Sequence, residues 1–115
     1  MTHKELIRDI TTTLRKPAVF RNLNFSRCEL AGMLGVGETL LSDVMNNEMG
    51  TTFHQLLNEN RCKYARKVMS SGLHDRETLE EIAAFCGFSS RLTMHRYFVG
   101  LYGVTPGQFK KTIGK

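Results

Sequence analysis

The feature that most constrains this sequence is an internal repeat. The segment LAGMLGV at residues 30–36 corresponds to IAAFCGF at 82–88, an offset of 52 residues. Further on, GTTFHQL at 50–56 corresponds to GVTPGQF at 103–109, an offset of 53. We place the extra residue in the middle helix of the second copy. Each copy then consists of a short helix, a glycine turn, a second helix and a capped third helix, an order typical of helix-turn-helix proteins.

Apolar residues recur every three or four positions along most of the chain, which is the pattern of amphipathic helices. No segment alternates with a period of two, so the sequence predicts an all-α fold without a sheet. Pro17 ends the first helix, and residues 17–24, PAVFRNLN, are expected to form a connector. The expected helices cover residues 3–16, 26–34, 38–46, 52–72, 78–86, 90–101 and 105 onward.

Four of these helices begin with a recognisable capping sequence, in which a serine or threonine is followed three positions later by glutamate or glutamine. The hydroxyl accepts a hydrogen bond from a free backbone amide, and the longer side chain reaches back to the cap. The four pairs are Ser26–Glu29, Thr52–Gln55, Thr78–Glu81 and Thr105–Gln108. Pro106 adds to the last pair, because proline fits the first position of a helix.

The second helix of each copy has one apolar side and one polar side. We expect the apolar sides to be buried; they comprise Leu40, Leu41, Val44 and Met45 in the first copy and Met94, Tyr97, Phe98 and Leu101 in the second. Arg91, His95 and Arg96 then lie on the exposed side of the second copy. Arginine pairs with O6 and N7 of guanine, so this face is suited to a DNA major groove. Met33 is also expected in a helix core.

The charge of the chain is confined to its C-terminal part. Residues 1–81 contain eleven Lys or Arg and eleven Asp or Glu, whereas residues 82–115 contain no acid. The formal charge of +5 therefore comes from Arg91, Arg96, Lys110, Lys111 and Lys115. A basic end on a neutral body indicates contact with a polyanion, most often a nucleic acid. A solvated tail could explain the three lysines, but it explains the two arginines less well.

Other classes of function find little support in the sequence. The three cysteines, at positions 28, 62 and 86, form no C-x-x-C motif, and the histidines supply no matching ligand spacing. We expect buried thiols, no metal and no cofactor. No nucleophile–base pair or glycine-rich phosphate loop is present, so an enzyme is not expected. The chain has neither a secretion signal nor an apolar run of about 18–20 residues, so we expect a cytoplasmic protein without membrane contact.

Two segments, LAGMLGVGETLLSDVMNNEMGTTFHQLL and EEIAAFCGFSSRLTMHRYFVGLYGVTPGQFKK, together resemble the DNA-binding domain of AraC/XylS-type bacterial transcription regulators. The resemblance covers about residues 26–111. It implies seven helices, arranged as two helix-turn-helix subdomains joined by a long central helix. The corresponding divisions are an N-terminal helix and connector (1–25), a first subdomain (26–57), a linker helix (53–72) and a second subdomain (73–115).

The resemblance also implies roles for individual residues in a sequence-specific DNA-binding output domain, with two recognition helices in successive major grooves of an asymmetric site. The base-contacting positions are Thr39, Ser42 and Asp43 in the first copy and Arg91, Leu92, His95 and Arg96 in the second. The backbone-contacting positions are Asn46, Thr52, Thr105 and Lys110. The implied partners are double-stranded DNA, RNA polymerase, and a sensing or dimerising domain elsewhere in a longer parent chain.

The first copy departs from the family pattern. Gly37 stands where serine usually caps the recognition helix, and that helix carries Glu38 and Asp43 but no Lys or Arg. We therefore expect the second copy to supply most of the affinity for DNA. The neutral first copy also keeps a second hypothesis open, in which the fold binds another protein, such as polymerase. Leu92 has two interpretations, a contact with a thymine methyl group or a place in the core.

Overall fold

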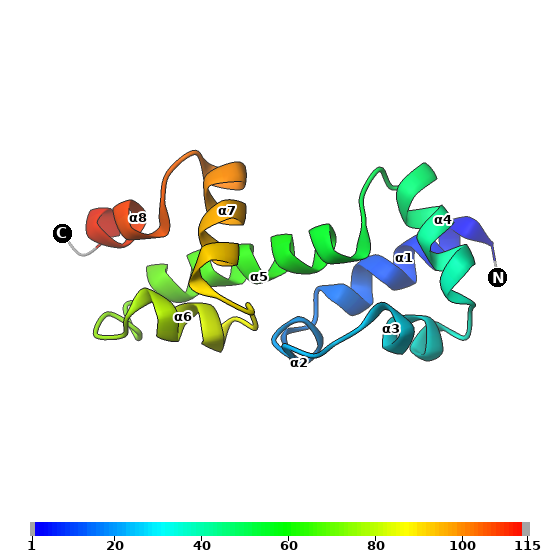
Figure 1. Ribbon diagram of the computed structural model, residues 1–115, viewed down its shortest axis with the longest axis horizontal. Helices are drawn as coiled ribbons and strands as arrows, with labels where there is room; N and C mark the ends of the chain where they lie inside the picture. Colours follow the sequence, from blue (N-terminus) through cyan, green and yellow to red (C-terminus); the bar gives the residue numbers. More distant parts are fainter. Residues whose placement is uncertain (1, 114–115) are drawn as a thin grey trace. The chain divides into compact units, whose positions relative to one another are not determined.

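The computed structural model describes residues 2–113, and within them it contains helices and no strand. Lys115, counted above with the C-terminal charge, lies outside the described residues. The helices are α1 (His3–Leu14), α2 (Pro17–Phe20), α3 (Arg27–Leu34), α4 (Glu38–Asn47), α5 (Phe53–Ser70), α6 (Leu79–Phe85), α7 (Arg91–Tyr102) and α8 (Pro106–Ile113) (Figure 1). The predicted all-α class is confirmed. No helix in this part of the chain is both long and apolar enough to cross a bilayer.

The expected number of helices was one too few, because the predicted connector contains α2. Pro17 occupies the first position of this helix, where its fixed backbone angle is favourable and its missing N–H is no loss. The backbone amides of Val19 and Phe20 both donate to the carbonyl of Lys16, at 2.9 and 3.0 Å. The side chain of Phe20 is buried. Burial of this ring stabilises a helix of four residues, which is too short to be recognised from the sequence pattern.

All four predicted caps are formed. In each, the hydroxyl oxygen accepts a hydrogen bond from the backbone amide three residues later, at 3.1–3.2 Å, the caps being Ser26, Thr52, Thr78 and Thr105. At Thr78 and Thr105 the reciprocal bond from the cap's own amide to the glutamate or glutamine side chain is also present. Local sequence therefore fixes where these four helices begin.

The chain divides into two compact units, one ending at Leu57 and the other beginning at Asn58. In unit 1, α1 packs against α2, α3 and α4 (Figure 1). Its buried residues include Leu6, Ile10, Leu14, Leu30, Leu41, Val44 and Met45. The first turn of α5 completes this unit, with Phe53 stacked on Phe25 at a ring separation of 6.0 Å.

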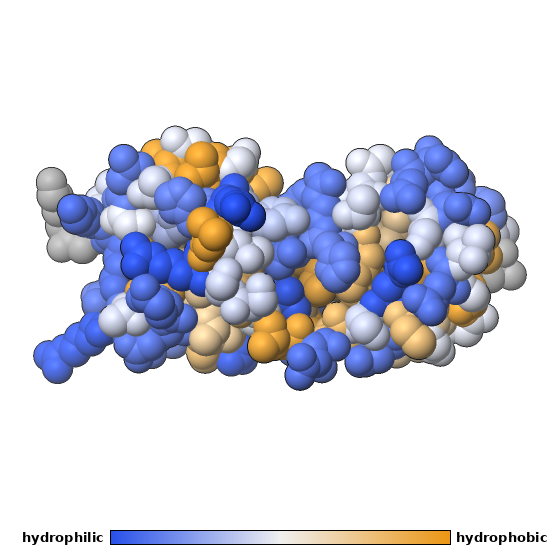
Figure 2. Space-filling view, in the orientation of Figure 1, coloured by the Kyte–Doolittle hydropathy of each residue, from blue (hydrophilic) through white to orange (hydrophobic). Residues whose placement is uncertain are grey.

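Unit 2 contains the rest of α5 together with α6, α7 and α8. Its core is formed by Cys62, Ala65, Val68, Met69, Ile82, Ala83, Cys86, Phe88, Met94 and Phe98. The ring of Phe98 lies 4.9 Å from that of Tyr102 and 5.4 Å from that of Phe109, so aromatic packing joins α7 to α8. Figure 2 shows hydrophobic surface over the end of α7 and the turn to α8, where Leu101 and Val104 are exposed.

The extra residue of the second copy lies in the turn, not in the middle helix as predicted. The caps of the first helices, Ser26 and Thr78, are 52 residues apart, whereas those of the second helices, Gly37 and Ser90, are 53 apart. The shift therefore arises before the second helix begins, where Ser89 separates Phe88 from the cap. From the cap onward the two copies run in the same register.

Several apolar residues expected in the core are exposed. Leu40 is 40% exposed, Leu101 38% and Met33 57%, and Cys28 is also exposed. In α4 the neighbours Leu41, Val44 and Met45 already fill the buried side. In α7 the ring of Phe98 contacts the rings of Tyr102 and Phe109, and Leu101 lies outside these contacts. Helical spacing identifies the apolar side of a helix, but tertiary packing determines how many residues of that side are buried.

Candidate DNA-binding surface

The outward side of α4 brings together the residues predicted to contact bases in the first copy. Each residue turns a helix by about 100°, so burial of Leu41, Val44 and Met45 directs positions 39, 43 and 46 outward, with 42 at the edge. Thr39, Asp43 and Asn46 are exposed, and Ser42 is half-buried. A shallow hollow of about 290 Å³ is lined by Arg27, Glu38, Thr39, Ser42 and Asp43.

The outward side of α7 likewise carries the residues predicted for the second copy. Met94 and Phe98 are buried in unit 2, and the exposed residues are Arg91, Leu92, His95 and Arg96. Leu92 is 56% exposed, so its interpretation as a core residue is wrong. This helix offers a surface that combines cationic and apolar side chains.

The repeat register aligns the two surfaces position by position. An offset of 53 pairs Thr39 with Leu92, Ser42 with His95, Asp43 with Arg96 and Asn46 with Val99. Val99 is 39% exposed and was missing from the predicted site. The signal that could have identified it is this register, because its counterpart Asn46 was already predicted to contact DNA.

An ion pair occupies the start of each of these helices, with opposite polarity in the two copies. In unit 2, Nη1 of Arg91 on α7 lies 2.9 Å from Oε1 of Glu80 on α6. In unit 1, Nε of Arg27 on α3 lies 3.3 Å from Oε1 of Glu38 on α4. The hydrogen bond from Arg91 is the largest influence that lowers the pKa of Glu80. Arg91 is therefore already engaged in the free protein.

His95 and Arg96 differ from Arg91 in this respect. Neither forms an ion pair or a side-chain hydrogen bond with any residue in the part of the chain that the structure describes. Both side chains are exposed. Their donors are thus available to a ligand without displacing a protein partner.

The N-terminus of α5 adds polar groups beside the α4 surface. A hollow of about 230 Å³ is lined by Asn46, Gly50, Thr51, Thr52 and Gln55. Two of the predicted backbone-contacting residues, Asn46 and Thr52, are thus brought together. The Thr52 hydroxyl accepts from the amide of Gln55 at 3.1 Å and can still donate its own proton. Free amides at the start of an 18-residue helix favour an anion there.

The other two predicted backbone contacts are placed differently. Thr105 caps α8 through its reciprocal bonds with Gln108, at 3.1 and 2.9 Å. Lys110 is half-buried, and its ammonium group donates to the main-chain carbonyl of Glu77. That group is therefore engaged within unit 2. No cluster of three or more possible metal ligands occurs among the described residues.

Comparison with known proteins finds a matching domain family and similar transcription regulators. The helix-turn-helix domain family matches residues 30–112. The porin thermoregulatory protein EnvY of Escherichia coli K12 is 31% identical over 77 residues, which is 67% of this chain and 29% of that protein. The probable transcriptional regulator LumQ of Photobacterium leiognathi is 26% identical over 85 residues, 74% of this chain and 33% of LumQ. The chain thus spans a third or less of these relatives.

Solved structures share the fold. The C-terminal domain of AraT, a response regulator from Geobacillus stearothermophilus, aligns with a TM-score of 0.74 at 24% identity, covering 92% of this chain and 84% of that one. A DNA-binding transcriptional dual regulator from Escherichia coli K-12 aligns with a TM-score of 0.72 at 22% identity, covering 91% and 92%. With the matched family and the regulator relatives, the chain belongs to the AraC-type helix-turn-helix domains, the DNA-binding output domains of bacterial transcription regulators.

Proposed function

We propose that the domain binds an asymmetric duplex site as a monomer, with α4 and α7 in successive major grooves. The observation that carries this proposal is the shared register of the two outward surfaces, in which four positions of α4 correspond to four of α7. A recognition helix reads base edges through its exposed side, and each unit offers one such side. Because the paired residues differ chemically, the two grooves would carry different sequences.

The side chains of α7 suit a site with both guanine and thymine. Arg96 has no protein partner among the described residues and can make paired hydrogen bonds to O6 and N7 of guanine. Leu92 and Val99 can contact the methyl group of thymine, and His95 can donate to a base or a phosphate. Nη1 of Arg91 already contacts Glu80, so a base would have to share or displace that contact.

The outward residues Thr39, Ser42, Asp43 and Asn46 of α4 are polar, and none of them is cationic. Asp43 can accept from the amino group of cytosine, while Thr39 and Ser42 can donate or accept. Asn46 and Thr52 would hold a phosphate beside the N-terminus of α5, and Thr105 would do so at α8. Lys110 would join these contacts by exchanging the Glu77 carbonyl for a phosphate.

The experiment is a selection of genomic binding sites with this domain, followed by titration of the selected duplex. We expect one asymmetric motif of about 17–20 base pairs, about two helical turns. Neutralising some four to six phosphates would give a log–log salt slope of about −4 to −5. Alanine at Arg96 should weaken binding more than alanine at Thr39 or Ser42. Equal losses at these three positions would contradict the proposed dominance of α7.

A second candidate function is a non-DNA interaction module, favoured by the neutral polar surface of α4. A protein interface would give a much shallower salt slope and no preference for the selected duplex. For the parent protein we propose a cytoplasmic, non-catalytic regulator that acts with RNA polymerase and carries a sensing or dimerising domain elsewhere. EnvY and LumQ, which are about three times longer than the matched region, support this wider proposal.

A further inference from the structure

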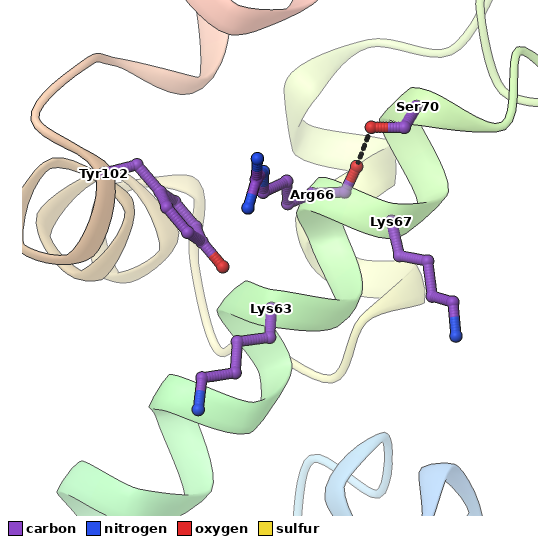
Figure 3. A pocket seen from close by; sticks show the side chains of 5 residues that line it. All are labelled: Lys63, Arg66, Lys67, Ser70 and Tyr102. Atoms are coloured by element: carbon purple, nitrogen blue, oxygen red, sulfur yellow. Dashed lines mark hydrogen bonds between the residues drawn. The ribbon is translucent and has the colours of Figure 1, made fainter.

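A cleft in unit 2 gathers three cationic side chains that the predicted DNA surface does not include. Lys63, Arg66 and Lys67 of α5 line it together with Ser70 and Tyr102, and its volume is about 550 Å³ (Figure 3). Positions 63, 66, 67 and 70 recur at helical spacing, so they lie on one face of α5. Tyr102 comes from the last turn of α7 and closes one side.

The side chain of Arg66 forms one wall of the cleft and lies over two aromatic rings. Its guanidinium carbon lies 4.8 Å from the centre of the Tyr102 ring and 5.8 Å from that of Phe109. Figure 3 shows the Arg66 side chain extended toward Tyr102. A guanidinium stacked on a ring keeps its N–H edge available for a carboxylate or phosphate. Burial raises the pKa of Tyr102, so the phenol hydroxyl remains a donor at neutral pH.

The lining of the cleft holds three cations and no acidic side chain among the residues that the structure describes. None of the three cations forms an ion pair within the described residues. Three acids of unit 2 are engaged elsewhere, Glu77 with His74, Glu80 with Arg91 and Glu81 with the amide of Thr78. The cleft therefore presents a local positive field that an anionic partner would complement.

The cleft lies at the C-terminal end of α7, beyond the predicted base-reading residues along the chain. Tyr102 follows His95 by seven residues, which places it within about 20° of His95 around the helix and about 10 Å further along the helix axis. A ligand in the cleft would thus approach the last turn of α7.

We propose that this cleft docks a short acidic segment of a partner protein. Lys63 and Lys67 are four residues apart, about 6 Å along α5, and can meet two carboxylates spaced by one helical turn. The edge of Arg66 accommodates a third acceptor. An apolar side chain of the partner would lie against Tyr102, which favours a protein over a DNA backbone because phosphates offer no apolar surface. This docking does not depend on the proposed reading of DNA.

The test is an NMR titration of the 115-residue chain with the synthetic peptide EELEELEE. We expect amide shifts at residues 63–70 and at Tyr102, and none from the neutral peptide QQLQQLQQ. The double variant Lys63→Gln, Lys67→Gln should bind the acidic peptide about five-fold more weakly. The control Arg76→Gln, Lys111→Gln removes the same charge from exposed positions of unit 2 outside the cleft, and should bind within about two-fold of the parent.

Three outcomes would overturn the proposal. The first is an equal loss in the control variant, which would indicate general charge attraction. The second is peptide shifts located on the α4 or α7 surfaces. The third is displacement of the peptide by a short duplex of unrelated sequence with shifts at the cleft, which would make it a DNA-backbone site. Binding of the selected duplex, measured in parallel, tests the proposed DNA function separately.

Discussion

Arg91 and Arg96 are five residues apart on the same helix, yet they differ in their contacts within the free protein. Arg96 is exposed and has no ion-pair partner among the described residues, whereas Arg91 is 2.9 Å from Glu80. The lowered pKa of Glu80 keeps its carboxylate ionised at neutral pH, so the pair is present under ordinary conditions. We expect a contact of Arg91 with DNA to compete with this pair and to bring the Glu80 carboxylate near phosphates. We therefore expect Arg91 to contribute less to DNA affinity than Arg96.

Replacing Glu80 with glutamine should strengthen DNA binding. The change frees Arg91 and removes a like charge from the DNA side, and exposed ion pairs of this kind correspond to about two- to five-fold in affinity. The matched control is Asp75→Asn, which removes the same charge from an exposed residue of the same unit. A fluorescence-anisotropy titration of both variants measures the effect. Weaker binding by Glu80→Gln would show that the pair instead positions Arg91 for DNA.

The three thiols should differ sharply in reactivity. Cys28 is exposed, whereas Cys62 and Cys86 are fully buried, and burial raises the pKa of Cys62 to about 12. Because the thiolate is the reactive form, iodoacetamide at about pH 8 should modify Cys28 alone in the native protein and all three in denaturant. Intact mass and peptide mapping report the sites. Native modification of Cys62 at a rate similar to Cys28 would mean that unit 2 opens readily.

Among the elements, the turn between α3 and α4 depends on a single backbone conformation. Gly35 has φ of 69°, and a Cβ at this position would meet no atom within 4 Å. Gly35→Ala should therefore destabilise the protein by about 1–2 kcal/mol through backbone strain alone. Gly32→Ala is the control, because Gly32 lies in α3 with equally open surroundings. That change should stabilise by about 0.5–1 kcal/mol.

Chemical denaturation of the two glycine variants measures both shifts. Opposite signs are the informative result, because both changes add the same methyl group next to empty space. Stabilisation by Gly35→Ala would refute the requirement for a left-handed residue in this turn.

The sequence predicted those elements whose signals are local. The cap at Thr78 depends on residues three positions apart, and the repeat revealed both helix pairs. The sequence did not reveal features that depend on tertiary packing. The α2 helix depends on burial of Phe20, and Leu101 is exposed because other rings fill the contact with Phe109. The ion pair of Arg91 joins two helices, so nothing in the α7 sequence alone could reveal it.

At the scale of the molecule, the two units differ in charge. Residues 1–57 contain six basic and six acidic side chains, whereas residues 58–115 contain ten and five. The whole net charge of +5 therefore belongs to unit 2. Basic residues of unit 2 also lie before the last 34 residues of the chain, among them Lys63, Arg66 and Lys67. Because non-specific affinity for DNA is mainly electrostatic, unit 2 should make the first contacts with DNA and unit 1 should add sequence discrimination.

This division predicts how the domain responds when its site is split. Successive major grooves on one face of a duplex are about 34 Å apart, so an insertion of about five base pairs between the two half-motifs turns the second groove to the opposite face. Binding should then fall to the level of a duplex that keeps only the unit 2 half-motif. The same insertion placed outside both half-motifs is the control and should have no effect. Gel-shift titrations of these duplexes measure the affinities. Unchanged binding to the split site would mean that one unit alone recognises DNA. Loss of all specific binding would mean that unit 2 cannot bind its half-motif without unit 1.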